Sequence, residues 1–237
     1  DCPEKEGRQQ EREGAEGSLV CLKTKEKKKM NRYFSNAGER QGVTVGVAGT
    51  ATGSGSTHFA LLFANYLSAV EQKRTALLEW NATGAFRKLE RICTGDEGKR
   101  PFSVLDVDYY PDSTGEELGI CLSRYEVLVL DFGVLREECT IQFHQCGIVC
   151  LLGSFSEWKL EELISSESWI LQGRKRWHYL MTFGSEEARK EAVRRYRMPF
   201  RRVPFVPDAF SINRETALFL EEIWRDKREK SQFCPRN

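Results

Sequence analysis

Residues 43–67, VTVGVAGTATGSGSTHFALLFANYL, constrain the fold of this chain more than any other stretch. An apolar, β-branched segment comes first, a glycine-rich turn follows, and an amphipathic stretch with helical spacing completes the unit. Later in the chain, apolar segments alternate with amphipathic ones in the same way. This alternation is typical of repeated βα units around a parallel sheet. We therefore expect an α/β fold with a doubly wound, mostly parallel sheet of about seven strands in a three-layer sandwich.

The expected strands are short and almost continuously apolar, as suits strands that are covered on both faces. They span residues 43–48, 75–79, 102–106, 126–131, 147–152, 177–182 and 201–204. The expected helices are the amphipathic stretches between them, at residues 57–71, 84–92, 135–143, 157–171, 185–196 and 213–228. Together these elements predict a single domain over residues 41–229.

The two ends of the chain differ from this pattern. Residues 1–40 are polar and mixed in charge, with too little apolar surface to offset the entropy lost on ordering. We expect a disordered charged tail there and a flexible C-terminal end at residues 230–237. Met30 is the first methionine, so the place of residues 1–29 in the native protein stays open.

Composition limits the classes of partner. The chain has 36 Lys and Arg against 35 Asp and Glu, so no overall charge attracts it to nucleic acid or membrane. Its eight cysteines are scattered without a C-x-x-C pair, which is typical of reduced thiols in a cytosolic protein. No apolar run approaches the roughly 20 residues of a membrane-spanning helix. These features predict a cytoplasmic location.

The glycine-rich turn is typical of a phosphate-binding loop. In such loops successive backbone N–H groups surround the anion, and the following helix presents its positive end. Gly49, Gly53 and Gly55 allow the backbone to approach closely, and Thr57 stands where a hydroxyl normally binds magnesium. Against the pattern G-x-x-x-x-G-K-[ST], however, a threonine replaces the first glycine and Ser56 replaces the lysine. The alternative is a tight turn whose glycines serve only strand-to-helix packing.

Two carboxylates follow apolar strands. Asp131 ends EVLVLD and would lie near the loop as a magnesium-associated acid; alternatively it caps the next helix. Glu79 ends TALLE and would point to the same crevice; alternatively it forms a salt bridge at the end of its strand.

Several stretches together resemble the MinD/ParA group of P-loop ATPases with a deviant Walker A motif. They are VGVAGTATGSGSTHFALLFANYL, RTALLEWNATGAF, VLVLDFG and VPFVPDAFS, and the similarity spans residues 43–224. The atypical TadZ/CpaE-like members, which accompany pilus machinery, are the most similar. The loop of the group reads K-G-G-x-G-K-[ST]-[ST], whereas this chain has Ala51 and Ser56 in place of the two lysines. The resemblance implies a P-loop NTPase-like fold that binds ATP or ADP with Mg²⁺ and has weak or absent ATPase activity.

The motif and the resemblance together predict a set of nucleotide-binding residues in the loop, at two strand ends and in two late segments. These are Gly49, Thr50, Gly53, Ser54, Gly55, Ser56, Thr57, His58, Glu79, Asp131, Thr182, Phe183, Pro207 and Asp208. The resemblance places the last four beside adenine, and Thr57 and Asp131 beside the metal ion. For His58, a hydrogen bond to a phosphate and one to a neighbouring loop both stay open. The remaining histidines and cysteines lack the spacing of metal ligands.

The resemblance implies a protein that positions or assembles a larger machine, such as a pilus system. Its partners would be proteins of secretion or pilus machinery, with a homodimer and peripheral membrane association through partners as further expectations. The alternative is a pseudo-ATPase scaffold that binds no nucleotide. A third hypothesis is an active ATPase in which another residue replaces the loop lysine, such as an arginine from elsewhere in the chain or from a dimer mate.

An arginine-rich stretch and the apolar stripe near the C-terminus each have a simple structural interpretation. The arginine-rich residues 194–202 are interpreted as a solvated charged face, so there is no strong nucleic-acid signal. The apolar stripe of residues 213–228 is expected to pack on the sheet, with membrane binding as the alternative.

Overall fold

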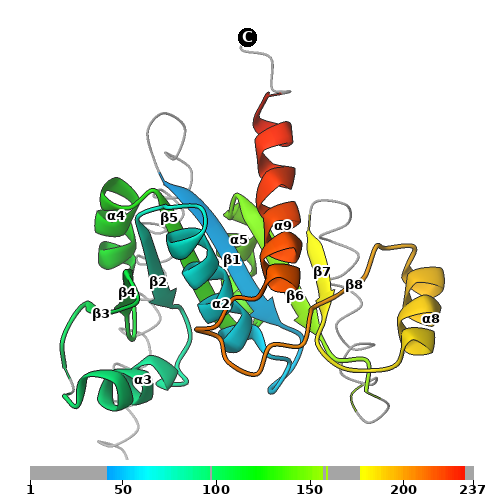
Figure 1. Cartoon of the computed structure of the whole chain (residues 1–237), viewed down its shortest axis with the longest axis horizontal. Helices are drawn as coiled ribbons and strands as arrows, with labels where there is room; N and C mark the ends of the chain where they lie inside the picture. Colours follow the sequence, from blue (N-terminus) through cyan, green and yellow to red (C-terminus); the bar gives the residue numbers. More distant parts are fainter. Residues whose placement is uncertain (1–41, 97, 157–158, 160–176, 233–237) are drawn as a thin grey trace, which may run out of the picture.

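The computed structural model describes residues 42–96, 98–156, 159 and 177–232. The expected tail at residues 1–40, nearly all of the expected helix at residues 157–171 and most of the expected C-terminal end therefore lie outside the described residues. The rest forms an α/β arrangement with one central sheet (Figure 1).

The described residues contribute eight strands to the sheet, in the order β3-β4-β2-β5-β1-β6-β7-β8. All neighbours are parallel except the antiparallel pair β3 and β4. The strands are β1 (Val43–Gly49), β2 (Thr75–Glu79), β3 (Phe102–Val104), β4 (Val107–Tyr110), β5 (Val127–Val134), β6 (Ile148–Gly153), β7 (His178–Met181) and β8 (Arg201–Arg202). The predicted fold class, a mostly parallel α/β sheet, is confirmed.

The register of the central strands brings three chain segments to one edge of the sheet. Val47 on β1 is level with Asp131 on β5, and Asp131 is in turn level with Glu79 on β2. On the other side of β1, Gly49 is level with Leu152 on β6. Because neighbouring parallel strands end at the same edge, the segments that follow β1, β5 and β6 begin side by side.

Helices cover both faces of this sheet. They are α2 (Ser56–Ala69), α3 (Ala85–Thr94), α4 (Gly115–Arg124), α5 (Thr140–Gln145), α8 (Glu186–Tyr196) and α9 (Arg214–Gln232), with a short 3-10 helix η1 (Glu137–Cys139). One core packs α4, α5 and α8 against one face, and the other packs α2, α3 and α9 against the opposite face. This is the expected three-layer sandwich (Figure 1).

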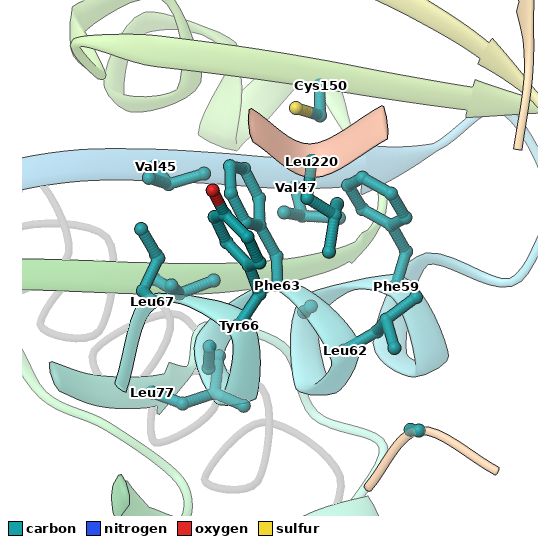
Figure 2. Packing of buried hydrophobic residues seen from close by; sticks show 14 of the residues in the cluster. Val45, Val47, Phe59, Leu62, Phe63, Tyr66, Leu67, Leu77, Cys150 and Leu220 are labelled. Atoms are coloured by element: carbon teal, nitrogen blue, oxygen red, sulfur yellow. The ribbon is translucent and has the colours of Figure 1, made fainter. Parts of the chain in front are cut away.

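The core beneath α2 explains why the glycine-rich loop has a rigid base. Figure 2 shows Phe59, Phe63 and Tyr66 of α2 directed toward Val45 and Val47 of β1. All five side chains are buried almost completely. Burial of a large aromatic side chain stabilises the fold by about 1.5–3 kcal/mol. The end of β1 and the start of α2 are thus both held by the core on either side of the loop.

The expected strand at residues 102–106 is only partly right. β3 ends at Val104, and the chain reverses at Leu105 and Asp106, which both have positive φ angles, before β4 begins. A two-residue reversal of this kind joins antiparallel strands. β4 was therefore missed, because the apolar run was interpreted as one strand where the chain forms a hairpin.

Two helix predictions also need correction. α4 was not predicted, although Thr114 and Glu117 form a capping box, which the T-x-x-E spacing signals. The expected helix at residues 135–143 is instead η1 followed by the short α5. Arg136 keeps an extended backbone, so the helical turns begin only after it.

The C-terminal helix packs as expected. Leu220, Ile223 and Trp224 of α9 are buried in the core that faces α2. None of the helices in the described residues is both long and apolar enough to cross a bilayer.

Candidate functional site

The loop between β1 and α2 has the backbone shape of an anion cradle. Gly53 and Gly55 have φ angles of 77° and 87°, a region in which other residues are strained. Beneath the loop, the Ser54 hydroxyl oxygen lies 1.8 Å from the point where a Cβ atom on Gly49 would be. The loop therefore folds back on the end of β1 so closely that position 49 requires glycine.

The cradle has unused hydrogen-bond donors. Among the described residues, the backbone N–H groups of Gly53, Gly55, Ser56 and Thr57 have no acceptor. The cap residue of α2 makes no side-chain bond, and the first turn of the helix carries no acidic residue. An uncompensated helix N-terminus behaves as roughly half a positive charge, so an anion is stabilised there.

Thr57 and Asp131 are brought together beside the cradle. The Thr57 hydroxyl donates a 2.7 Å hydrogen bond to one carboxylate oxygen of Asp131, across 74 residues of sequence. The other carboxylate oxygen accepts from the backbone N–H of Gly133 at 3.0 Å. The Asn81 side chain donates to the backbone carbonyl of Asp131 at 2.9 Å, a support that sequence reasoning missed.

The electrostatic environment of Asp131 is unusual for a carboxylate. Its side chain is fully buried, and burial raises the pKa of Asp131 above its ordinary value. Hydrogen bonds from Thr57 and Gly133 lower that pKa and partly oppose the effect, while the nearby charge of Glu79 raises it further. A nearby cation would relieve the cost of keeping this carboxylate ionised.

These two side chains fit a magnesium ion. Mg²⁺ uses one or two protein oxygens and completes its octahedron with water and substrate phosphates. The Thr57 hydroxyl and the Asp131 carboxylate supply two oxygens at the end of the anion cradle. Groups of three or more His, Cys, Asp or Glu side chains with metal-binding geometry are absent from the described residues.

Thr182 connects the cradle to β7. Its hydroxyl donates to the Ser54 carbonyl at 3.0 Å, and its backbone N–H donates to the Gly153 carbonyl at 3.1 Å. Its methyl carbon lies 3.2 Å from the point where a Cβ atom on Gly55 would be. Thr182 therefore supports the cradle from below as well as bordering it.

An apolar pocket of about 340 Å³ adjoins the cradle. It is lined by the loop, by the first turns of α2 and by two later segments: Gly53, Gly55, His58, Phe59, Leu62, Thr182, Phe183, Val203, Pro204, Phe205, Val206 and Pro207. Phe205 is 83% exposed and Phe183 is 49% exposed, so both rings offer faces for stacking. An apolar pocket with aromatic walls next to an anion cradle suits a flat ring attached to phosphates.

Two predicted residues have local roles at this pocket. The His58 ring lies 2.8 Å from the Val206 carbonyl through Nε2, which is the neighbouring-loop alternative for this residue. Asp208 is exposed and accepts a 3.0 Å hydrogen bond from the backbone N–H of Phe210. Asp208 does not line the pocket, whereas Pro207 does.

Glu79 is bonded away from the cradle. One carboxylate oxygen accepts from the backbone N–H groups of Ala85 and Phe86 at 2.7 and 3.3 Å, and the other accepts from Asp112 at 3.2 Å. The Thr83 hydroxyl donates to the first oxygen at 3.2 Å. Glu79 thus accepts hydrogen bonds from N-terminal N–H groups of α3, a role that was not predicted from the sequence.

Lys159 is a residue of this site that sequence reasoning missed. Its ammonium donates to the Thr52 carbonyl of the loop at 2.5 Å, across 107 residues of sequence. A single lysine in SFSEWKL, far from any motif, carries no signal of this position in the sequence. The contact between Lys159 and Thr52 forms because β1 and β6, which precede these two residues, are neighbours in the sheet.

Comparison with protein-family models finds no match, and none of the curated proteins searched matches the chain. Solved structures do match. The chain is similar to a ParA family ATPase from Chlorobium tepidum TLS, with 15% identity and a TM-score of 0.54 over 79% of this chain and 93% of that one. A putative plasmid partition protein from Borrelia burgdorferi B31, bound to AMPPNP, matches with 15% identity and a TM-score of 0.58 over 80% and 99%.

The cell division ATPase MinD from Pyrococcus furiosus matches with 10% identity and a TM-score of 0.53, over 80% of this chain and 99% of that one. At these identities the likeness concerns the fold alone. The fold of this chain is therefore that of the MinD- and ParA-type ATPases, as the sequence resemblance predicted.

Proposed function

We propose that this protein is a nucleotide-binding switch of the MinD/ParA type, which holds ATP or ADP with Mg²⁺ at the β1–α2 loop. One observation carries the proposal. Among the described residues, backbone N–H groups without an acceptor and the Thr57–Asp131 hydrogen bond occur together in the loop region that adjoins an apolar pocket. A structural neighbour was solved with the nucleotide AMPPNP, which supports a nucleotide as the ligand. In this arrangement the loop holds phosphates and the pocket holds the base.

Different residues bind the phosphates, the base and the magnesium ion. The N–H groups of Gly53, Gly55 and Ser56 orient the phosphates, and Phe205 and Phe183 cover the ring and exclude water from it. The Thr57 hydroxyl and the Asp131 carboxylate would hold a magnesium ion, which would supply positive charge to offset that of the phosphates.

We propose that hydrolysis is weak or absent. The two lysine positions of the related loops hold Ala51 and Ser56, and neither side chain carries a charge. Charged contacts to the transferring phosphoryl group stabilise the transition state, so their loss reduces turnover more than binding. Binding without rapid turnover suits a protein that recruits or positions a larger assembly in the cytoplasm.

Among assemblies, we propose secretion or pilus machinery of the TadZ/CpaE type, with protein partners and a homodimer of this chain. The support is the sequence resemblance, together with solved neighbours that include a MinC:MinD cell division protein complex from Aquifex aeolicus. Co-purification from cells that produce a pilus, with and without ATP, tests this part of the proposal.

Calorimetric titration of the folded protein with ATP and Mg²⁺ tests the ligand. We expect saturable binding in the micromolar range and slow or undetectable release of phosphate. If no heat of binding is found at millimolar ATP, the nucleotide switch is wrong and the scaffold hypothesis takes its place.

A further inference from the structure

We propose that Lys159 places an ammonium group beside the β1–α2 loop, and that this group contacts the phosphates of the bound nucleotide. The inference rests on the proposed nucleotide binding and adds a residue to that site. Lys159 lies after β6, outside the loop and outside every stretch that resembles a known motif.

The geometry places the ammonium at the cradle itself. Nζ of Lys159 donates to the Thr52 carbonyl at 2.5 Å. The same nitrogen lies 3.3 Å from the point where a Cβ atom on Gly53 would be. The charge therefore lies against the two residues that precede Ser54, next to the free N–H of Gly53.

The backbone of the segment after β6 positions this lysine. The N–H of Lys159 donates to the Ser156 carbonyl at 2.8 Å. The Ser156 N–H donates to the Ser154 hydroxyl oxygen, and the Ser154 hydroxyl donates to the Ser156 hydroxyl oxygen. Ser154 follows β6 directly, and β6 pairs with β1. Because parallel neighbours end at the same edge, a residue just beyond β6 reaches the loop just beyond β1.

The charge environment of Lys159 follows from the residues that the structure describes. Within the described part of the chain, Asp and Glu side chains make no ion pair with Lys159, and Thr52 uses one of the three ammonium donors. The Lys159 ammonium, the N–H groups of the loop that have no acceptor among the described residues, and the N-terminus of α2 together concentrate positive potential at one point. An anion with several oxygens, such as a di- or triphosphate, satisfies all of these groups at once.

The alternative role for Lys159 is a brace that holds the loop through Thr52 without contacting a ligand. The two roles predict different measurements. A brace changes the stability of the protein without nucleotide, whereas a phosphate contact changes nucleotide affinity and its dependence on salt.

The main experiment compares Lys159→Met with Lys88→Met, a control that removes an exposed lysine from α3. Calorimetry with ATP and Mg²⁺ is expected to show about ten- to a hundredfold weaker binding for Lys159→Met, because hydrogen bonds to charged groups contribute about 1.5–3 kcal/mol. Lys88→Met should bind like the unaltered protein. Adding Ser56→Lys to Lys159→Met, which restores a lysine within the loop, should recover most of the lost affinity.

A second measurement needs no variant. Amine-reactive labelling of the unaltered protein, followed by peptide mass analysis, should show that ATP protects Lys159 several-fold more than Lys88. This arm keeps the test valid if Lys159→Met fails to fold.

The outcomes separate the two proposals. If the unaltered protein binds ATP but Lys159→Met binds equally well and ATP leaves Lys159 labelling unchanged, the role of Lys159 is overturned and the nucleotide site stands. A lower unfolding midpoint of Lys159→Met with unchanged ATP affinity indicates the brace and also overturns it. If the unaltered protein binds no ATP, both proposals fail.

Discussion

The Thr57 hydroxyl and the Asp131 carboxylate are joined by a 2.7 Å hydrogen bond, although they belong to different elements, α2 and β5. β5 lies beside β1, and α2 begins just after the loop that follows β1, so the sheet order makes the contact. Both oxygens are hard ligands, and both lie at the end of the anion cradle. If the proposed magnesium ion binds at this site, the Thr57 hydroxyl and the Asp131 carboxylate are the oxygens that would hold it.

The first prediction concerns that ion. We expect Asp131→Asn to weaken ATP binding about tenfold when Mg²⁺ is present and to leave binding in excess EDTA unchanged, because an amide is a poor magnesium ligand. Calorimetry in the two conditions measures both values. Asp208→Asn is the control, since Asp208 is exposed and does not line the pocket. Equal weakening with and without the metal contradicts the assignment.

The second prediction concerns pH and the protein without ligand. Burial raises the pKa of Asp131 above its value of 3.8 in the unfolded chain, so the native state binds more protons between those two values. The contribution of Asp131 to the free energy of unfolding therefore falls as pH rises through this window. The stability of Asp131→Asn relative to the unaltered protein should therefore increase as pH rises above 3.8. Urea unfolding at several pH values measures the gain, and a pH-independent difference argues against the raised pKa.

The third prediction concerns the support under the cradle. Thr182→Val removes the hydroxyl that donates to the Ser54 carbonyl but keeps a methyl group against Gly55. We expect a loss of about 1–2 kcal/mol in the free energy of unfolding and weaker ATP binding, because a hydrogen bond to the loop is lost. Thr182→Ser retains the hydroxyl and should retain most of the affinity. Denaturant titration and calorimetry together show whether stability and binding change as expected.

The fourth prediction concerns the pocket wall. Phe205 is 83% exposed, so Phe205→Ala should change the free energy of unfolding by less than about 0.5 kcal/mol. We expect several-fold weaker binding of ATP and unchanged binding of inorganic tripolyphosphate, which has no ring to stack. Competition between the two ligands measures the difference. If both ligands weaken equally, Phe205 does not contact the base.

The fifth prediction separates Glu79 from the nucleotide site. Glu79→Gln keeps the shape of the side chain but removes the charge at the N-terminus of α3, and we expect a loss of about 1–3 kcal/mol in stability. If the variant folds, ATP affinity should be unchanged, because both oxygens of Glu79 are engaged by α3 and Asp112. A specific loss of ATP binding would instead support the role that the sequence motif predicted.

The sequence by itself determined the parts of this protein that depend on local rules. Glycines at positive φ, the apolar run before them and the amphipathic helix after them predict a strand, a cradle and a helix, because each requirement is met within a few residues. Asp131 could be placed near the loop because it follows the apolar run VLVL, although β5 continues past Asp131 to Val134. The hairpin between β3 and β4 was missed because Leu105 rarely adopts a positive φ and because neither glycine nor asparagine marks the turn.

Only the tertiary structure decided which distant side chains meet. Glu79 ends β2 and Asp131 lies level with it inside β5, yet Glu79 binds the N-terminus of α3 and Asp131 binds Thr57. Lys159 reaches Thr52 because β6 pairs with β1, and no pattern within either segment contains that pairing. The physical reason is that backbone conformation follows from neighbours in sequence, whereas the approach of charges follows from the order of strands and from the packing that fixes it.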